Sequence, residues 1–510
     1  MDNKLLFGPE EFYEDSAKDL RAYLEEISKY WENELDHNFC GSTPSLRHGL
    51  YDYFEFIMKT NLRRFIVSYL GIALCKRDTT SNLNETNQIT SRFLNESVNY
   101  IELIGQSIHK LTHYLYECPQ NAAEKSMIRV RLIEERSLSN SSRPCSYNCD
   151  LKSIGKKFNN TQCAKAIDCR YVSNGFDVCQ KKNSSRRYEW IKDYDGNIYG
   201  KSMSIKKNNI CQGKITKLNS EFLWYNGYYC DYCVCTCVEK PKRSNHVVTA
   251  ISFRDQTSDI YNDWVVTGIR FVRKDYLIHL QIQEGLLLPY GKIGTTRWRP
   301  LDRFEYNEME GRYYRVFERD SKLGRIVEYL PMRLGSDYGR AETVNLDDVM
   351  APGSHVVTGV RFRFSWDSIG TPRRKRGPIE LHIRVTKMDF AKGRLLNLNN
   401  SWWITPDYHD SRGELALKNP DDPRNAWEQG GSVSTATSVR FRASDWVKDA
   451  GQSTVPFFDG RDTSFTPAAP LQGLGVFHLG HEGFGGYLAL RIFDFDMSPF
   501  FNSHFTDPNL

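Results

Sequence analysis

Alternation of apolar and polar positions recurs through the C-terminal half of the chain. The segment Trp264-Val-Val-Thr-Gly-Ile-Arg-Phe271 returns as His355-Val-Val-Thr-Gly-Val-Arg-Phe362, and a weaker copy is Thr435-Ala-Thr-Ser-Val-Arg-Phe441. A period of two with β-branched residues is typical of strands. Repetition at intervals is the signature of related structural units. The pattern therefore predicts a three-fold all-β domain over residues 245–510.

A second motif follows each copy: Ile278-His-Leu-Gln-Ile282, Leu381-His-Ile-Arg-Val385 and Leu488-Ala-Leu-Arg-Ile492. This spacing places His279 and His382 at equivalent positions, where we expect exposed strand histidines rather than metal ligands. The first two copies also share a glycine, Gly268 and Gly359, and Ser438 takes that place in the third. Because glycine weakens a strand interior, its recurrence predicts a β-bulge or the close approach of another backbone.

Residues 1–137 show a helical period instead. Apolar side chains at three- and four-residue spacing predict a first helix over residues 9–35 and a second with Thr43 as N-cap and Pro44 as N1. A third is expected over about 84–116 and a fourth over about 119–137. Comparable helices joined by short loops predict an antiparallel bundle. In that topology Cys40 and Cys118 lie at the same end, so we expect them to form a disulfide bond.

The middle segment, residues 138–244, lacks periodicity and contains ten of the 13 cysteines. One Cys-x-x-Cys step, at Cys230–Cys233, raises the alternative of zinc, but no second pair completes a site, so disulfide bonds are favoured. The chain also contains N-glycosylation sequons, at Asn84, Asn95, Asn140, Asn159, Asn183 and Asn399. Dense cysteines with sequons indicate a secreted glycoprotein. No apolar signal sequence follows Met1, so we expect this to be the mature form.

Charge is concentrated in the same segment, with 19 Lys and Arg against 9 Asp and Glu, whereas the whole chain has a net charge of +5. A basic surface on a secreted protein is suited to sulfated glycans, anionic head groups or acidic proteins; a surface that only favours solubility is the alternative. The candidate residues for an anionic partner are Lys181, Lys182, Arg186, Arg187, Lys240, Lys242 and Arg243.

Candidate ligand and processing residues lie in the β-domain. Trp402, Trp403 and Tyr408 are candidates for stacking on sugar rings, the alternative being that they belong to the core. The run Arg373-Arg-Lys-Arg376 resembles a furin-type cleavage sequence, which makes Arg376 a candidate processing site. No catalytic motif, metal site or cofactor fingerprint is recognisable, nor is a nucleic-acid-binding module. The longest apolar run covers ten residues, whereas a spanning helix needs roughly 20, so no transmembrane segment is expected.

These repeats resemble the β-prism of vitelline-membrane outer-layer and jacalin-type lectin folds; a β-trefoil is the alternative with the same symmetry. The segment Gly485-Gly-Tyr-Leu-Ala-Leu-Arg-Ile-Phe493 is similar to the glycine-rich hairpin with which jacalin-type lectins hold a sugar. This resemblance implies Gly485, Gly486 and Tyr487 as ligand-binding residues. The aspartate expected two residues after the aromatic is Ala489 here, so the family's sugar contact is incomplete. The order of the three regions also resembles a group of uncharacterised secreted insect proteins.

Together these features predict a multi-domain protein that combines a helical bundle, a basic disulfide-rich module and a three-fold β-domain. Its expected role is extracellular recognition of glycan, matrix or protein through β-domain loops and the basic module, without a cofactor. The odd number of cysteines is compatible with a disulfide-linked homo-oligomer. A structural or storage component of an extracellular coat and a membrane-active, pore-forming-like protein are the alternatives; an enzyme is not expected.

Overall fold

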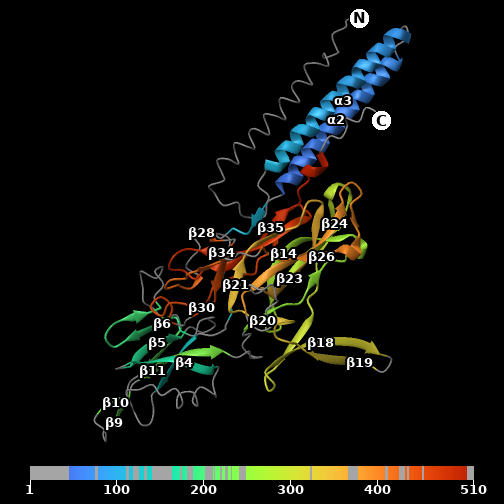
Figure 1. Ribbon diagram of the computed structural model, residues 1–510. Coiled ribbons are helices and arrows are strands. Elements are labelled where there is room, and N and C mark those ends of the chain that lie inside the picture. The colour runs from blue at the N-terminus through green and yellow to red at the C-terminus, as the bar shows by residue number, and fades with distance from the viewer. Residues whose placement is uncertain are drawn as a thin grey trace.

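The computed structural model describes residues 45–74, 79–110, 114–118, 126–130, 135–140, 163–172, 175–180, 188–200, 211, 213–218, 221–223, 228–230, 232–239, 248–321, 324–365, 377–407, 412–423, 431–433, 436–450 and 453–501. A helical hairpin projects from a body of β-sheets (Figure 1). This arrangement confirms the prediction of a helical N-terminal part followed by a large β-rich region.

The hairpin consists of α2 (Leu46–Leu74) and α3 (Thr79–Lys110). Helix α2 begins where the Ser45 hydroxyl accepts a hydrogen bond from the backbone N–H of His48 at 3.2 Å, as an N-cap does. The same hydroxyl donates to the buried carboxylate of Asp494 at 2.6 Å, and Arg47 lies 3.6 Å from that carboxylate. These contacts join the start of α2 to the strand that ends at Asp494, near the end of the chain. Apolar residues of both helices pack beside these contacts.

The distal half of α2 differs from its base, because large apolar side chains are exposed there: Leu62, Ile66, Val67, Tyr69, Leu70 and Leu74. Among the described residues, neither helix is long and apolar enough to cross a membrane. The predicted first helix, over residues 9–35, lies outside the described residues, as do Thr43 and Pro44, so the bundle remains a prediction.

The predicted fourth helix is wrong. Its described residues include β2 (Met127–Ile128) and the start of β3 (Glu135–Asn140) and no α-helix, and β1 (Tyr114–Tyr116) precedes them. β1 and β2 pair with strands from the end of the chain. Their sequence carried a strand signal, since apolar Ile128, Val130 and Leu132 alternate with arginines.

The predicted β-domain contains three units. The first has β12 (Ala250–Ser252), β13 (Gln256–Thr257), β14 (Trp264–Lys274), β15 (Leu277–Leu287) and β16 (Ile293–Trp298). The second has β20 (Tyr338–Arg340), β21 (Thr343–Leu346), β22 (Asp348–Met350), β23 (His355–Phe364), β24 (Ile379–Asp389), β25 (Arg394–Leu396) and β26 (Trp402–Ile404). The third has β27 (Gly413–Leu415), β28 (Gly431–Val433), β29 (Thr437–Arg440), β30 (Arg442–Ala443), β31 (Thr454–Val455), β32 (Phe457–Asp459), β33 (Thr463–Ser464), β34 (Leu471–Gly480) and β35 (Tyr487–Asp494).

All three units have the same strand order around a long hairpin, which is β14–β15, β23–β24 or β34–β35. A short strand of the same unit runs parallel to the second hairpin strand: β12, β21 or β32. The first strand of each hairpin pairs with a strand from the preceding unit, which is β33, β13 or β22. We call these the exchanged strands. The strand on the far side of that short parallel strand comes from the following unit: β20, β29 or β2. Strand β2 therefore completes the three-fold arrangement, and residues 129–249 form an insertion within the first unit.

A bulge and a glycine occur at the same point of each hairpin. The register shifts between Val266 and Gly268 and between Val357 and Gly359, as the sequence predicted. An added Cβ on Gly359 would lie 2.9 Å from Thr257 Cγ2 and 3.0 Å from a backbone oxygen of exchanged strand β13. Both alternatives in the prediction are thus confirmed, since the glycine follows a bulge and admits another backbone.

The structure corrects the predicted alignment of the third unit. The third bulge precedes Gly473, whose Cβ would lie 2.8 Å from the Val349 oxygen of exchanged strand β22. Ser438 instead lies in β29, between β21 and β27 of the second sheet. The two histidines are not equivalent either: the residue paired with Arg270 is Gln281, whereas the one paired with Arg361 is His382. His279 and His382 are both buried rather than exposed.

The insertion is built from short strands: β3, β4 (Cys163–Val172), β5 (Phe176–Gln180), β6 (Trp190–Asp193), β7 (Ile198–Tyr199), β8 (Lys214–Leu218), β9 (Glu221–Leu223), β10 (Tyr228–Cys230) and β11 (Tyr232–Glu239). A disulfide bond joins Cys179 to Cys211. Cys118, Cys233, Cys235 and Cys237 are also disulfide-bonded. Disulfide bonds, rather than zinc, therefore account for these cysteines. Cys40, the predicted partner of Cys118, lies outside the described residues.

Candidate ligand site

A three-stranded arm projects from the first unit. A hollow lies at the base of this arm. The arm contains β17 (Arg303–Asn307), β18 (Arg312–Ser321) and β19 (Gly324–Pro331), which form a separate antiparallel sheet. Its hairpin projects from the lower end of the body (Figure 1). The Asp275 carboxylate, in the turn between β14 and β15, accepts a hydrogen bond from the backbone N–H of Phe304 at 3.0 Å. This bond sets the start of β17 beside the first hairpin.

Tyrosine rings form the walls of the hollow. Tyr276 belongs to the β14–β15 turn and has a positive φ of 72°. Its ring lies 6.1 Å from that of Tyr306 on β17, and Tyr306 packs at 4.8 Å on the buried ring of Tyr313. Tyr314 on the central strand β18 and Tyr329 on β19 meet edge to face at 6.4 Å. Tyr313 is thus part of the core, whereas Tyr276, Tyr306, Tyr314 and Tyr329 line the hollow.

The turn between β17 and β18 supplies polar groups. The Asn307 side-chain oxygen accepts hydrogen bonds from the backbone N–H groups of Met309 and Glu310, at 3.0 and 3.3 Å. The Asn307 amide donates to the Glu310 carboxylate at 3.1 Å, and the Tyr314 hydroxyl donates to it as well. The latter bond raises the pKa of Tyr314. Glu310 is therefore held in place before any ligand arrives.

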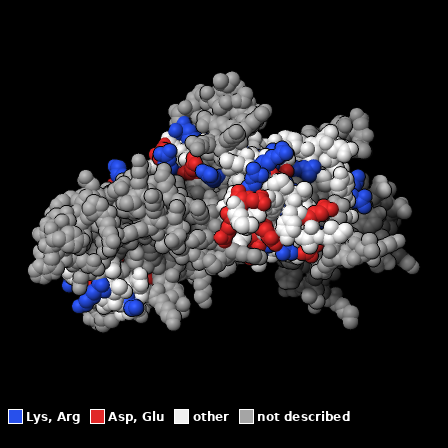
Figure 2. Space-filling model, turned by 90° about the horizontal axis from the view of Figure 1, so that it is seen from below, with Lys and Arg blue, Asp and Glu red and all other residues white. Residues whose placement is uncertain are grey.

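The hollow has a volume of about 710 Å³ and is lined by Tyr276, Glu305, Tyr306, Asn307, Glu308, Met309, Glu310, Tyr314 and Tyr329. That size suits a small ligand or a few residues of a polymer. Acidic side chains gather on the face of the molecule seen from below, near basic ones (Figure 2). Flat apolar rings beside fixed carboxylate and amide groups can bind a ligand that has both an apolar face and hydrogen-bond donors.

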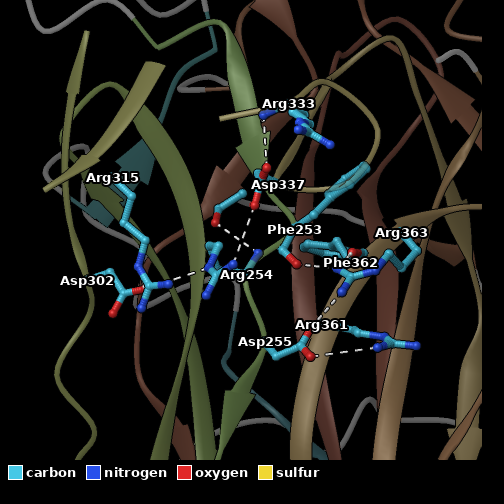
Figure 3. A network of polar contacts seen from close by, with 11 residues as sticks. Phe253, Arg254, Asp255, Asp302, Arg315, Arg333, Asp337, Arg361, Phe362 and Arg363 are labelled. Atoms are coloured by element: carbon cyan, nitrogen blue, oxygen red, sulfur yellow. Dashed lines mark hydrogen bonds and ion pairs between the residues drawn. The ribbon is translucent and has the colours of Figure 1, made fainter. Parts of the chain in front are cut away.

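Ion pairs tie the arm to the three-fold body (Figure 3). Asp302, just before β17, lies 2.8 Å from Arg315 and 3.6 Å from Arg254. Arg254 also pairs with Asp337 at 3.4 Å, which follows the arm in the chain. Arg254 precedes exchanged strand β13, so both ends of the arm are linked to the strand that joins the first two units. These groups are partly exposed, and each pair contributes little stability alone.

The sequence-predicted Trp403 takes part in a different arrangement, which we call a clamp. In a clamp, an arginine forms an ion pair with an aspartate beside an exchanged strand and stacks on an aromatic ring of a neighbouring strand. Arg361 lies 3.7 Å from Asp255 and 3.9 Å from the Trp403 ring centre. The Trp403 ring is therefore covered by an arginine. Trp402 is 42% exposed and meets the ring of His355 at 4.9 Å. Tyr408 lies outside the described residues.

Equivalent clamps occur in the other two sheets. Arg270 lies 3.0 Å from Asp462 and 4.1 Å from the Trp298 ring centre. In the third sheet, Arg491 pairs with Asp348 through two hydrogen bonds and lies 5.6 Å from the Tyr114 ring centre. Trp298, Trp403 and Tyr114 pair with corresponding positions of the three hairpins. The three aromatics therefore have a shared structural role.

The glycine-rich segment suggested by the lectin resemblance is not accessible. An added Cβ on Gly485 would lie 2.4 Å from Val455, and Gly486 has a φ of +61° in contact with His478. Tyr487 is buried. These residues pack within the third unit and present no surface to a ligand, which corrects the expectation that they bind one.

Several other predicted residues fall outside the part of the chain that the structure describes. Among them are Arg376 and the basic candidates Lys181, Lys182, Arg186, Arg187, Lys240, Lys242 and Arg243, together with Asn159 and Asn183. Of the sequons, Asn84, Asn95 and Asn399 are exposed, as glycosylation requires. Within the described ranges, no three His, Cys, Asp or Glu side chains are grouped as a metal site would need.

Sequence reasoning missed the hollow, although a local signal was present. Residues 305–314 read Glu-Tyr-Asn-Glu-Met-Glu-Gly-Arg-Tyr-Tyr, which combines turn residues with tyrosines and glutamates. The contribution of Tyr276 had no such signal, because it depends on the contact between the first hairpin and the arm.

In a comparison with protein families, the model of a domain of unknown function (DUF4803) matches residues 37–282. The matched range contains α2, α3, the insertion and the start of the first unit, and it ends within β15. The arm and the second and third units lie beyond it. No curated protein matches the chain.

Proposed function

We propose that this chain is a secreted carbohydrate-binding protein, with the hollow at the base of the arm as its binding site. The observation that carries the proposal is the combination of tyrosine rings with the fixed Asn307 and Glu310 groups. The C–H face of a sugar ring packs on an aromatic ring, while its hydroxyls donate to carboxylates. Pockets that combine apolar walls with a few placed polar groups are typical ligand sites.

We further propose a β-prism for the three-fold domain. Support comes from three sheets of matching strand order, each centred on a hairpin and completed by an exchanged strand. A β-trefoil would instead require strands that close into a barrel. The exchanged strands make the three sheets interdependent, so the domain offers a rigid base from which the arm projects.

The test is binding of the intact chain to an array of neutral, amino and acidic oligosaccharides, followed by titration of the strongest binder. Tyr329→Ala removes a half-exposed ring from the hollow and should weaken binding about tenfold, because a lost stacking contact costs about 1–1.5 kcal/mol. Tyr261→Ala is the matched control, since Tyr261 is 77% exposed and does not line the hollow. Equal loss in both variants, or none in Tyr329→Ala, would exclude the hollow as the site.

A further inference from the structure

The charge of the hollow goes beyond what a neutral sugar requires. Its described lining includes Glu305, Glu308 and Glu310 but neither Lys nor Arg. The whole chain, by contrast, has a net charge of +5. Arg312 and Arg340 lie near enough to oppose the rise in pKa that the Glu310 hydrogen bond causes at Tyr314 and that burial causes at Tyr306. Carboxylates gathered around a partly enclosed space attract positive charge, and the attraction strengthens as a ligand displaces water.

The geometry of the carboxylates and rings favours a compact cation. Glu310 is fixed by the neutral groups of Asn307 and Tyr314, whereas Glu305 is already paired with Arg303 at 3.1 Å, so the β17–β18 turn supplies the carboxylates for a cation. An ammonium group has three donors, which suits an array of carboxylate and amide oxygens. The faces of tyrosine rings also attract cations.

From these observations we infer that the hollow recognises a carbohydrate bearing a free, protonated amino group. The inference rests on the proposed carbohydrate-binding function and names the class of sugar. The ammonium group would pair with the carboxylates of the β17–β18 turn, while the sugar ring packs on tyrosine. N-acetylation of the same sugar removes the charge and two of the three donors, and it adds bulk where the carboxylates lie.

The experiment compares a short oligomer of glucosamine with its fully N-acetylated counterpart, titrated into the intact chain at a pH below the pKa of the amine. We expect at least tenfold tighter binding of the free-amine oligomer, and a smaller difference as salt rises, because salt screens exposed charges. Glu308→Gln should weaken binding of the free-amine oligomer several-fold and leave the acetylated one unchanged. Glu482→Gln, an exposed position in the turn of the third hairpin, is the matched control.

The possible failures are distinguishable. Equal affinity for the two oligomers, or tighter binding of the acetylated one, would overturn the amine inference and leave the carbohydrate function standing. Equal weakening by Glu308→Gln and Glu482→Gln would show attraction to the overall charge and would also overturn it. If no oligosaccharide of any charge binds the intact chain, the proposed function fails, and the inference fails with it.

Discussion

The first two β-units and the third make the same clamp with the arginine on opposite strands. In the first two, Arg270 and Arg361 lie on the first strand of the hairpin and face Gln281 and His382. In the third, the first strand has Gly475, and the arginine is its partner Arg491 on the second strand. An added Cβ on Gly475 would lie 3.0 Å from Arg491 Cγ. The glycine therefore makes room for an arginine that reaches across the pair.

This difference shows that the contact, rather than the sequence motif, is equivalent in the three units. The aspartate of the exchanged strand needs a cation on the facing hairpin, and either strand can supply it. The third clamp is also the most buried. The Arg491 and Asp348 side chains are 11% and 19% exposed, against 27% and 50% for Arg270 and Asp462. Burial and paired hydrogen bonds should make it the strongest of the three.

The glycine that admits the exchanged strand should show the largest effect. Gly359→Val places a branched side chain against Thr257 and the backbone of β13, so it should destabilise the β-domain by about 3 kcal/mol. Gly353→Val is the control, because an added Cβ there meets nothing within 4 Å. Denaturant unfolding of both variants measures the difference. If Gly359→Val were neutral or stabilising, strand propensity would outweigh the close approach, and the equivalence of the units would lose its physical basis.

The stability lost when a clamp arginine is replaced should increase with the burial of the clamp. Arg491→Gln removes the guanidinium from the Asp348 carboxylate in a partly buried site and should cost about 2–3 kcal/mol. Arg270→Gln, at the more exposed clamp, should cost about 1 kcal/mol or less. Equilibrium unfolding of the two variants under the same conditions tests the ranking. Equal losses would show that burial does not distinguish the third clamp from the first.

Local patterns predicted the features that act locally. The repeats gave the strands, and the recurrence of Gly268 and Gly359 gave the bulge and the close approach. The third copy was misplaced because Leu471-Gln-Gly-Leu-Gly-Val-Phe477 lacks the arginine of the other two, which is on the opposite strand. The pairing of β2 with β32 joins residues more than 300 positions apart, and no short-range pattern encodes it. The hollow was missed for the same reason, since its walls come from separate elements.

The three units also differ at one position of the second hairpin strand, which is occupied by His279, Glu380 and Ala489. Burial lowers the pKa of His279 to about 4, from an ordinary value of 6.5. The folded state thus favours the neutral ring. The contribution of His279 to the free energy of unfolding is therefore complete above pH 6.5 and is lost as the pH falls from 6.5 toward 4. The loss from this group should reach about 2 kcal/mol at pH 5.

His279→Ala places at this position the alanine that the third unit has there. The variant should show a smaller dependence of the free energy of unfolding on pH. The variant also loses the packing of His279 on Phe304 of the arm, at 4.9 Å, so its stability at pH 7 should be lower. The readout is therefore the difference between urea unfolding at pH 7 and pH 5, measured for each protein. Burial also lowers the pKa values of His48, His382 and His478, so some pH dependence should persist. An unchanged difference would assign the acid sensitivity to those residues.

The smallest effect, and the sharpest test of equivalence, is expected from moving the third arginine to the strand used by the other units. Gly475→Arg combined with Arg491→Gln reproduces the pair Arg270–Gln281. Gly475→Arg alone should be destabilising, because its Cβ meets both Asp348 and Arg491. In the double variant Arg491 is gone and the Asp348 carboxylate regains a cation, so the net loss should be about 1 kcal/mol or less. A double-mutant cycle by denaturant unfolding measures this recovery. If the two losses simply add, the strands are not interchangeable, and the clamps are similar contacts without a common design.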